Sequence, residues 1–182
     1  GHRSGVCNLS WDPGYRRLAT SGADGQVLIW DAASGTLLRT IAFSKDPVWG
    51  LSWNHDGSAV LAGDMRGRLS LWSVSGAATV PRWTISLNSD VRAISCASGG
   101  DDFVVGDALG RVRRVDGSGT IRSFAQHGDM VLSAHWSATD GQIRTSSRDG
   151  TARIFNAATS DEIARFRPHA REIWAVSWAP SR

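Results

Sequence analysis

Apolar and polar residues alternate along this chain in short runs, and each run is closed by a turn signal. Val6 to Trp11 alternates with period two, which is typical of a strand with one buried face. Asp12-Pro13-Gly14 breaks this run. A second apolar run follows and ends at Ala23-Asp24-Gly25, which is a hairpin signal. Runs at Val27–Trp30 and Thr36–Phe43 complete four strands in about 42 residues. No stretch shows helical periodicity, so the pattern predicts an all-β protein.

The same phrase returns at a nearly constant interval. The positions equivalent to Trp11 are Trp53, Cys96, Trp136 and Trp178, so the steps are 42, 43, 40 and 42 residues. A period of this length is typical of architectures that repeat one supersecondary unit. Because a single four-stranded sheet cannot bury both of its faces, we expect the sheets to stack side by side around an axis. No linker or low-complexity stretch divides the chain, which predicts one domain.

These phrases resemble the WD-repeat β-propeller family. The resemblance is carried by Trp30-Asp31 at the end of the third strand, by the Gly1-His2 opening and by the Asp24-Gly25 turn. It implies a β-propeller segment of four four-stranded antiparallel blades plus the first strand of a fifth. The blades are expected at about residues 1–43, 44–87, 88–126 and 127–168, with a partial fifth at 169–182. Further blades outside this sequence, or association of copies, would then close the ring.

In that family each blade holds a buried polar chain of His, Ser or Thr, Asp and Trp. The resemblance places this structural network at His2, Thr20, Asp24 and Trp30 in the first repeat, and at His127, Thr145 and Asp149 in the fourth. Phe155 stands for the Trp in the fourth repeat, the second repeat keeps only Trp72, and the third keeps no member. A buried carboxylate, imidazole and indole N–H all need hydrogen-bond partners. We therefore expect these residues to be structural rather than catalytic.

The resemblance also implies a face that binds partners. In members similar to the G-protein β-subunit, contacts recur at the residues just before and just after the first-strand Val, and at the residue before the turn Asp. The candidates at these places are Pro47, Trp49, Met65, Asp90, Arg92, Met130, Leu132, Arg148, Glu172 and Trp174, with Gly5, Cys7, Ala23 and Ala108 at the remaining equivalents. They would form an apolar, aromatic patch with a charged rim, and Trp and Arg are typical binding anchors. The alternative is that Trp49 and Trp174 pack on neighbouring blades as additional core.

Nothing in the motifs predicts an enzyme. Ser, His and Asp are plentiful, but no Gly-x-Ser-x-Gly elbow stands between a strand and a helix. No His, Cys, Asp or Glu residues have the spacing of a metal site. Gly117-Ser118-Gly119 is expected to be a turn, because no helix follows it as it would in a phosphate loop. We therefore expect neither a cofactor nor a metal.

Composition adjusts this picture only slightly. Lys and Arg number 20 against 17 Asp and Glu, and a net charge of +3 is not by itself a nucleic-acid signature. The clusters Arg111, Arg113, Arg114 and Arg165, Arg167, Arg171 keep nucleic-acid binding open, although a solvated face explains such runs more often. Only two cysteines, no leader and no membrane-spanning run are present, which favours a cytoplasmic location.

Arg114 occupies a place that is apolar in the other repeats. A buried unpaired arginine costs several kcal/mol, so we expect Asp101, Asp102 or Asp107 as its partner, or exposure of its strand at an interface. The sequence as a whole predicts a non-catalytic scaffold that binds a protein or peptide on one propeller face. The alternatives are a nucleic-acid-associated propeller, and a sensor or regulatory domain fused to an effector outside this chain.

Overall fold

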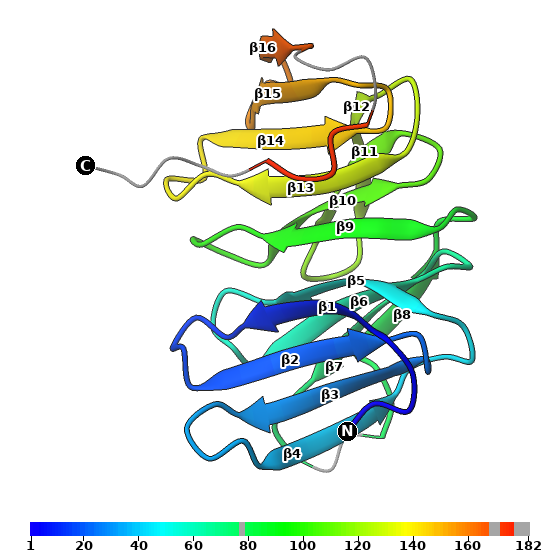
Figure 1. The fold of residues 1–182 in the computed structure, drawn as a ribbon. Coiled ribbons are helices and arrows are strands. Elements are labelled where there is room, and N and C mark those ends of the chain that lie inside the picture. Colours follow the sequence, from blue (N-terminus) through cyan, green and yellow to red (C-terminus); the bar gives the residue numbers. More distant parts are fainter. Residues whose placement is uncertain (77–78, 168–171, 177–182) are drawn as a thin grey trace.

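A computed structural model describes residues 1–76, 79–167 and 172–176 (Figure 1). In these ranges the chain forms sixteen strands and no helix, arranged as four antiparallel sheets. The first sheet contains β1 (Val6–Trp11), β2 (Arg17–Gly22), β3 (Gln26–Asp31) and β4 (Leu37–Ala42), and the second contains β5 (Val48–Trp53), β6 (Ala59–Asp64), β7 (Arg68–Ser73) and β8 (Trp83–Ser86). The third contains β9 (Val91–Cys96), β10 (Asp102–Asp107), β11 (Arg111–Asp116) and β12 (Ile121–Gln126), and the fourth contains β13 (Val131–Trp136), β14 (Gln142–Ser147), β15 (Ala152–Asn156) and β16 (Glu162–Phe166).

The second hairpin of each sheet turns on the glycine that keeps the repeat period. Gly25, Gly67, Gly110 and Gly150 have φ angles of 74°, 85°, 77° and 79°. This left-handed region is open to glycine at little steric cost. At Gly25 a Cβ atom would also lie 2.1 Å from the carbonyl oxygen of Ser44. The regular glycine spacing therefore reflects a backbone conformation and a close approach of the next repeat.

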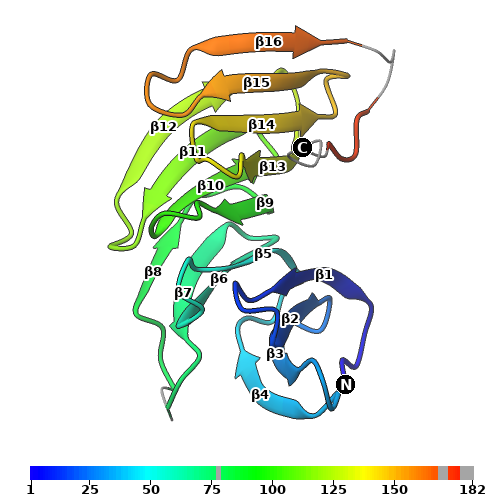
Figure 2. The same ribbon diagram turned by 90° about the vertical axis from the view of Figure 1, so that its left-hand side faces the viewer.

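The four sheets follow one another in chain order, and their first strands lie next to each other (Figure 2). β1 contacts β5, β5 contacts β9, and β9 contacts β13, whereas β4, β8, β12 and β16 are the outer edges of their sheets. Apolar side chains fill the space between consecutive sheets. Val91 packs against Gly63 of the preceding sheet, where a Cβ would lie 2.4 Å from its Cγ1, and Val131 packs in the same way against Gly106.

Hydrogen bonds between first strands add to this packing. Ser10 Oγ accepts a hydrogen bond from the Trp53 backbone N–H at 3.4 Å, and Ser52 Oγ accepts one from the Cys96 N–H at 3.2 Å. The Trp53 indole N–H donates to the Ser10 carbonyl oxygen at 3.0 Å. The serine at one repeat position thus bonds each of the first two sheets to the next one.

The outward faces of the end sheets carry exposed apolar residues. Val6 is 59% exposed and Trp11 is 47% exposed, whereas Val48, Val91 and Val131 are fully buried. Of the residues equivalent to Trp11, Trp53 and Trp136 are buried and Cys96 is half-buried. Trp11 stays exposed because no described segment covers that side of β1. On the fourth sheet, Ile163 and Phe166 of β16 are about half exposed.

Only part of the expected fifth-blade strand, Ile173–Trp178, lies within the described residues. Residues 172–176 belong to no strand ladder, although the Ile173 N–H donates to the Ser147 carbonyl oxygen at 3.2 Å. His169 and Trp178 lie outside the described residues. In the described ranges no helix is long and apolar enough to cross a membrane.

Candidate interaction face

The candidate face is built at the starts of the first strands. In each sheet a backbone hydrogen bond joins the residue before the first-strand Val to the turn between the second and third strands. The four bonds run from Ala23 N–H to Gly5 O (2.8 Å), Met65 to Pro47 (3.0 Å), Ala108 to Asp90 (2.9 Å) and Arg148 to Met130 (2.9 Å). Two of the three contact places that the family resemblance implies are therefore neighbours in every sheet.

The third place is a β-bulge in every sheet. The pairing between first and second strands shifts by one residue at Cys7, Trp49, Arg92 and Leu132, so each of these residues has no ladder partner. A bulge re-aims a side chain and bends its strand. The preceding Val stays in the ladder and, in the last three sheets, is fully buried. The bulge thus separates a packing residue from the residue at the candidate face.

Trp49, Arg92 and Asp90 form one cluster across the second and third sheets. The Arg92 guanidinium lies 4.7 Å from the Trp49 ring centroid and 2.6 Å from Asp90 Oδ2. Trp49 Nε1, Arg92 Nε and Asp90 Oδ1 are buried, and no residue of the described ranges hydrogen-bonds to them. Burial raises the pKa of Asp90; Arg92 opposes this effect, and the carboxylates of Asp64 and Asp107 add to it. The cluster therefore holds polar atoms whose hydrogen-bonding capacity is unused.

The remaining candidates surround this cluster with different exposures. Pro47, Met130 and Leu132 are half-buried, whereas Met65 is exposed. Arg148 Nε donates to Glu172 Oε1 at 2.6 Å, which ties residues 172–176 to the fourth sheet. Trp174 is 70% exposed. Trp49 is thus partly engaged in packing, as the core alternative expects, whereas Trp174 is not.

The first sheet brings His2, Thr20, Asp24 and Trp30 together. His2 Nδ1 lies 3.0 Å from Asp24 Oδ1, and His2 Nε2 lies 2.9 Å from Thr20 Oγ1. The Trp30 indole N–H donates to Thr20 Oγ1 at 2.9 Å. Thr20 can then donate its own proton to His2 Nε2, which leaves the Nδ1–H of His2 to donate to Asp24. Burial raises the pKa of Asp24, but hydrogen bonds from the Arg3 N–H and the His2 ring outweigh it and hold this pKa below its ordinary value.

The fourth sheet brings together His127, Thr145 and Asp149. His127 Nδ1 lies 3.1 Å from Asp149 Oδ2, and its Nε2 lies 2.7 Å from Thr145 Oγ1. No indole is present at this place, and Thr151 and Arg153 extend the network instead. Thr151 Oγ1 donates to Asp149 Oδ1 at 2.6 Å, and Arg153 Nη2 lies 3.1 Å from Asp149 Oδ2.

These contacts shift both titratable groups in the fourth sheet. Burial and the Arg153 guanidinium lower the pKa of His127, and this effect exceeds the opposing one of Asp149. Burial raises the pKa of Asp149, but hydrogen bonds from Thr151, from the Gly128 N–H and from His127 bring it far below its ordinary value. The network therefore favours a neutral imidazole beside an ionised carboxylate.

The second sheet contains a buried carboxylate that the family resemblance did not indicate. Asp64 ends β6, two residues before Arg66, which stands where the network Asp is expected. Asp64 is 2% exposed, and its Oδ1 accepts the backbone N–H groups of Arg66 and Arg68 at 2.9 Å each. The turn is thus still capped by a carboxylate, but from a position two residues earlier.

Asp107 has the same position in the third sheet and more partners. Its Oδ1 accepts the N–H groups of Leu109 and Arg111, and its Oδ2 accepts from Arg111 Nε and Arg113 Nη1 at 2.7 Å each. The missed signal was an aspartate three residues before the turn glycine in both repeats.

The arginines of β11 are occupied within the third sheet. Arg111 and Arg113 pair with Asp107, and Arg114 pairs with Asp102. Arg114 Nη1 also donates to the Ala157 carbonyl oxygen of the fourth sheet at 2.6 Å. The expectation that Arg114 has a nearby aspartate is therefore confirmed with Asp102. Each of the three arginines thus has a carboxylate partner, and Arg111 and Arg113 share one.

No metal-ligand group stands out in the described part of the chain. No cluster of three or more His, Cys, Asp or Glu side chains there could hold an ion.

His55 Nδ1 lies 2.7 Å from Asp101 Oδ1 of the next sheet, and this hydrogen bond raises the pKa of His55. Burial lowers the pKa of His135 to about 4 and raises that of Cys96 to about 12.

A family model described as "WD domain, G-beta repeat" matches residues 1–31, 35–73 and 118–156, which is more than half of the chain. The chain belongs to the WD-repeat family. The recognition made from the sequence is therefore confirmed. The second and third matched WD repeats begin before an outer strand and end in the third strand of the next sheet, so each WD repeat ties two sheets together. The third sheet, which lacks the family's four network residues, is the least matched.

Known WD-repeat proteins resemble the whole length of this chain. It is 22% identical over 189 residues to the SIR4-interacting protein SIF2 of Saccharomyces cerevisiae, covering 95% of the chain and 35% of that protein. It is 22% identical to guanine nucleotide-binding protein subunit beta-5b of Danio rerio, and the match covers 100% of this chain and 37% of that protein. It is 23% identical to cell division cycle 20.1, cofactor of APC complex, of Arabidopsis thaliana, and the match covers 94% of this chain and 39% of that protein. The chain spans less than two fifths of these relatives.

A solved structure confirms the propeller fold. A chain in a crystal structure of the mitotic checkpoint complex superimposes with a TM-score of 0.82 at 21% identity, covering 96% of this chain and 55% of that one. An all-β WD-repeat propeller architecture is thus established for the four sheets.

Proposed function

We propose that this WD-repeat chain is a non-catalytic scaffold that binds a protein or peptide on the face formed by the starts of β1, β5, β9 and β13. The observation that carries this proposal is the β-bulge found in all four first strands. A bulge at one strand end would be a local irregularity, whereas the same bulge in four sheets presents four side chains on one face. Bulges are over-represented next to functional sites, which supports this reading.

The chemistry of the face supports a protein or peptide partner. Met65 and Trp174 are exposed apolar residues, and Arg92 and Arg148 supply hydrogen-bond donors beside them. Trp and Arg are the side chains most often found as binding anchors. The names of three relatives also refer to protein association, as an interacting protein, a subunit and a cofactor of a complex. A cytoplasmic location is part of the proposal, because Cys7 and Cys96 are free thiols.

The test is selection of a displayed peptide library on the chain, followed by titration of the selected peptides. Trp174→Ala and Met65→Ala should each weaken binding by about tenfold, since interface anchors commonly cost 1 kcal/mol or more when truncated. Tyr15→Ala is the matched control: Tyr15 is 76% exposed, and it follows the opposite end of β1. Equal loss with Tyr15→Ala, or unchanged binding with both face variants, would contradict the proposed face.

Trp49→Ala separates binding from packing. If Trp49 serves only as core, this variant lowers the melting temperature and leaves peptide affinity unchanged. If Trp49 is an anchor, affinity falls by more than the fraction of unfolded protein explains.

A further inference from the structure

A cleft runs along β4 where the first sheet faces the second. It consists of two adjoining cavities, one of about 620 Å³ beside Leu38–Ala42 and one of about 880 Å³ beside Ser44–Asp46. Ala42 lines both cavities, so they meet end to end. The opposite wall of the first cavity comes from β7 and from Val74, Gly76 and Thr79, and that of the second comes from β7 and β8. We call this feature the β4 cleft; its first cavity lies at the outer strands, whereas its second cavity adjoins the candidate interaction face, because Asp46, Asp64 and Arg66 flank Pro47 and Met65 in the sequence.

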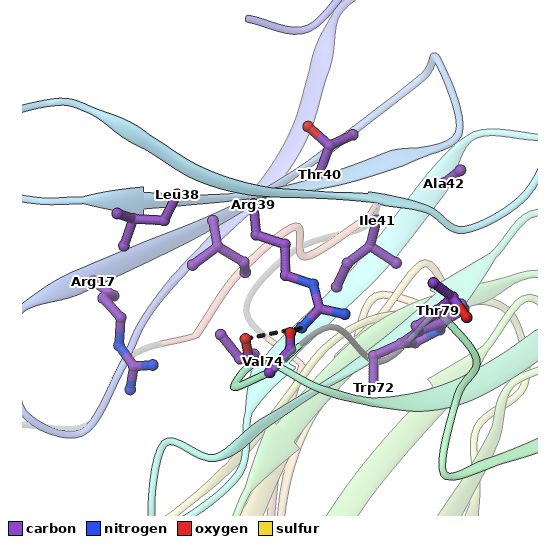
Figure 3. Close-up of a pocket in the computed structure, with 11 residues that line it drawn as sticks. Arg17, Leu38, Arg39, Thr40, Ile41, Ala42, Trp72, Val74 and Thr79 are labelled. Atoms are coloured by element: carbon purple, nitrogen blue, oxygen red, sulfur yellow. Dashed lines mark hydrogen bonds between the residues drawn. The ribbon is translucent and has the colours of Figure 1, made fainter.

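The first cavity has an apolar floor and a fixed width. Ile41 and Trp72 line it, and the Ile41 and Arg39 side chains point from β4 toward Val74 (Figure 3). Arg39 Nη1 donates to the carbonyl oxygens of Ser73 and Val74 at 2.9 Å each. Because one guanidinium thus bonds the two walls together, the cleft is already formed in the free chain. A preformed groove avoids part of the entropic cost of binding.

The cleft carries an excess of positive charge. Two arginines and no carboxylate line the first cavity, although Arg17 is paired with Asp12 at 3.0 Å. Three cations and two carboxylates line the second cavity, which leaves one net positive charge. Asp46 and Arg66 offset each other at 3.3 Å, and the buried Asp64 accepts backbone N–H groups. Lys45 is exposed, and Arg68 donates to the Phe43 carbonyl oxygen rather than to an acid. The field in the cleft therefore favours an anionic occupant.

The shape of the cleft favours an extended polypeptide. β4 is the last strand of its sheet, so no described strand pairs with its outer edge. An extended segment beside its six residues would be about 20 Å long at 3.3 Å per residue. Alternate side chains of such a segment point to opposite sides, so apolar ones can enter the floor while acidic ones reach the cations. Trp72 is half-buried, and no exposed aromatic platform for stacked bases lines the cleft.

We propose that the β4 cleft is a second docking site, which takes an acidic, extended segment of a partner protein in which apolar and acidic residues alternate. This site borders the face formed by the first-strand bulges and goes beyond the function proposed above. A partner that engages both places would gain affinity from the link between its two contacts.

The probe is a fluorescein-labelled heptapeptide of alternating Asp and Val, titrated by fluorescence anisotropy at about 50 mM salt, where screening is weak. The test variant combines Leu38→Glu and Lys45→Glu, one residue in each cavity. Both side chains are exposed, and neither makes a hydrogen bond with a described residue. The control combines Ile121→Glu and Arg122→Glu, which make the same change of charge on exposed residues of β12 in the third sheet.

The proposal expects the cleft variant to weaken peptide binding by about tenfold, which corresponds to 1.4 kcal/mol, and the control to leave it within about twofold of the wild type. Higher salt should weaken binding to the wild type, and a heptapeptide of alternating Lys and Val should not bind. Equal affinities for the cleft and control variants would overturn the proposal. So would an oligothymidylate that binds the cleft when the acidic peptide does not. Sedimentation that shows the cleft variant breaking a dimer, with no peptide binding, would assign the cleft to a second copy and also overturn it.

Discussion

Asp107→Asn is the substitution with the largest expected effect for the smallest change of shape. The Asp107 side chain is fully buried. Its Oδ1 accepts the backbone N–H groups of Leu109 and Arg111, and its Oδ2 accepts from Arg111 Nε and Arg113 Nη1 at 2.7 Å each. An asparagine can keep the two Oδ1 bonds, but its amide N–H₂ group then faces two cationic donors. The two charge-assisted hydrogen bonds are lost, and two guanidinium groups lose their carboxylate.

The size of the loss follows from these contacts. Hydrogen bonds to charged groups each contribute about 1.5–3 kcal/mol to stability. The Arg111 side chain is 32% exposed and the Arg113 side chain 13%, so water compensates the first more than the second. We expect the free energy of unfolding to fall by about 3 kcal/mol, which is within the range for breaking a buried ion pair.

Asp64→Asn is the matched control, because Asp64 occupies the same position in the second sheet. Its two hydrogen bonds within the described residues both run from backbone N–H groups to Oδ1, and it pairs with no guanidinium there. An amide oxygen can accept both bonds, so the expected loss is about 1 kcal/mol. The difference between the two variants therefore isolates the contribution of the arginines.

The assay is urea unfolding followed by the fluorescence of the nine tryptophans, with the m-value compared among variants. In the double variant Asp107→Asn, Arg113→Gln, the loss should be smaller than the sum of the two single losses, because the second substitution removes an unpaired cation. A loss for Asp107→Asn no greater than that for Asp64→Asn would refute the reasoning.

Three further outcomes follow from other buried sites. Ala62→Ser should stabilise the chain by about 1 kcal/mol in thermal or urea unfolding. The serine hydroxyl offers an acceptor to the buried Trp72 indole N–H, which has no partner in the described ranges. Unchanged stability would show that the indole is not within reach of this hydroxyl. Gly63→Ala should cost about 2 kcal/mol or more, because its Cβ would lie 2.4 Å from Val91 Cγ1, and a Val91→Ala background should reduce that cost. Burial lowers the pKa of His135 to about 4, so its neutral form stabilises the fold above the unfolded-state pKa near 6.5 and this stability is lost as pH falls toward 4. Between pH 7 and 5 the wild type should lose about 2 kcal/mol more than His135→Gln, and equal losses would contradict a buried neutral imidazole.

The strands and their order could be predicted because their signals are local. The alternation from Val6 to Trp11 requires one buried face, and Asp24-Gly25 requires a turn, wherever the rest of the chain lies. The period then placed the same elements in the later repeats, including the third, which retains little of the family's sequence. Exposure could not be predicted in this way. Trp11 and Trp53 hold equivalent positions, yet only Trp53 is covered, because the neighbouring sheet decides burial and the repeat does not.

The polar sites show a second limit. At the position where the family's network has its Asp, the second and third repeats have Arg66 and Leu109. From the motif alone, these repeats are therefore expected to lack the turn carboxylate. The structure supplies it from Asp64 and Asp107, two residues earlier, because a carboxylate at the end of the second strand also reaches the turn N–H groups. The requirement is a capped turn, and more than one register satisfies it. A search for the physical need would have found both residues, whereas a search for the motif position could not.

Each first strand combines a uniform residue with a variable one. The residue that starts the ladder is Val in all four sheets: Val6, Val48, Val91 and Val131. The next residue, at the bulge, is a different type in each sheet: Cys7, Trp49, Arg92 and Leu132. In the last three sheets this Val is fully buried against the preceding sheet, which favours a side chain of one size. The bulged residue has no ladder partner and is free of that constraint. This combination supports the proposed binding face, in which a partner would be recognised by the residues that differ while the sheets keep the same packing.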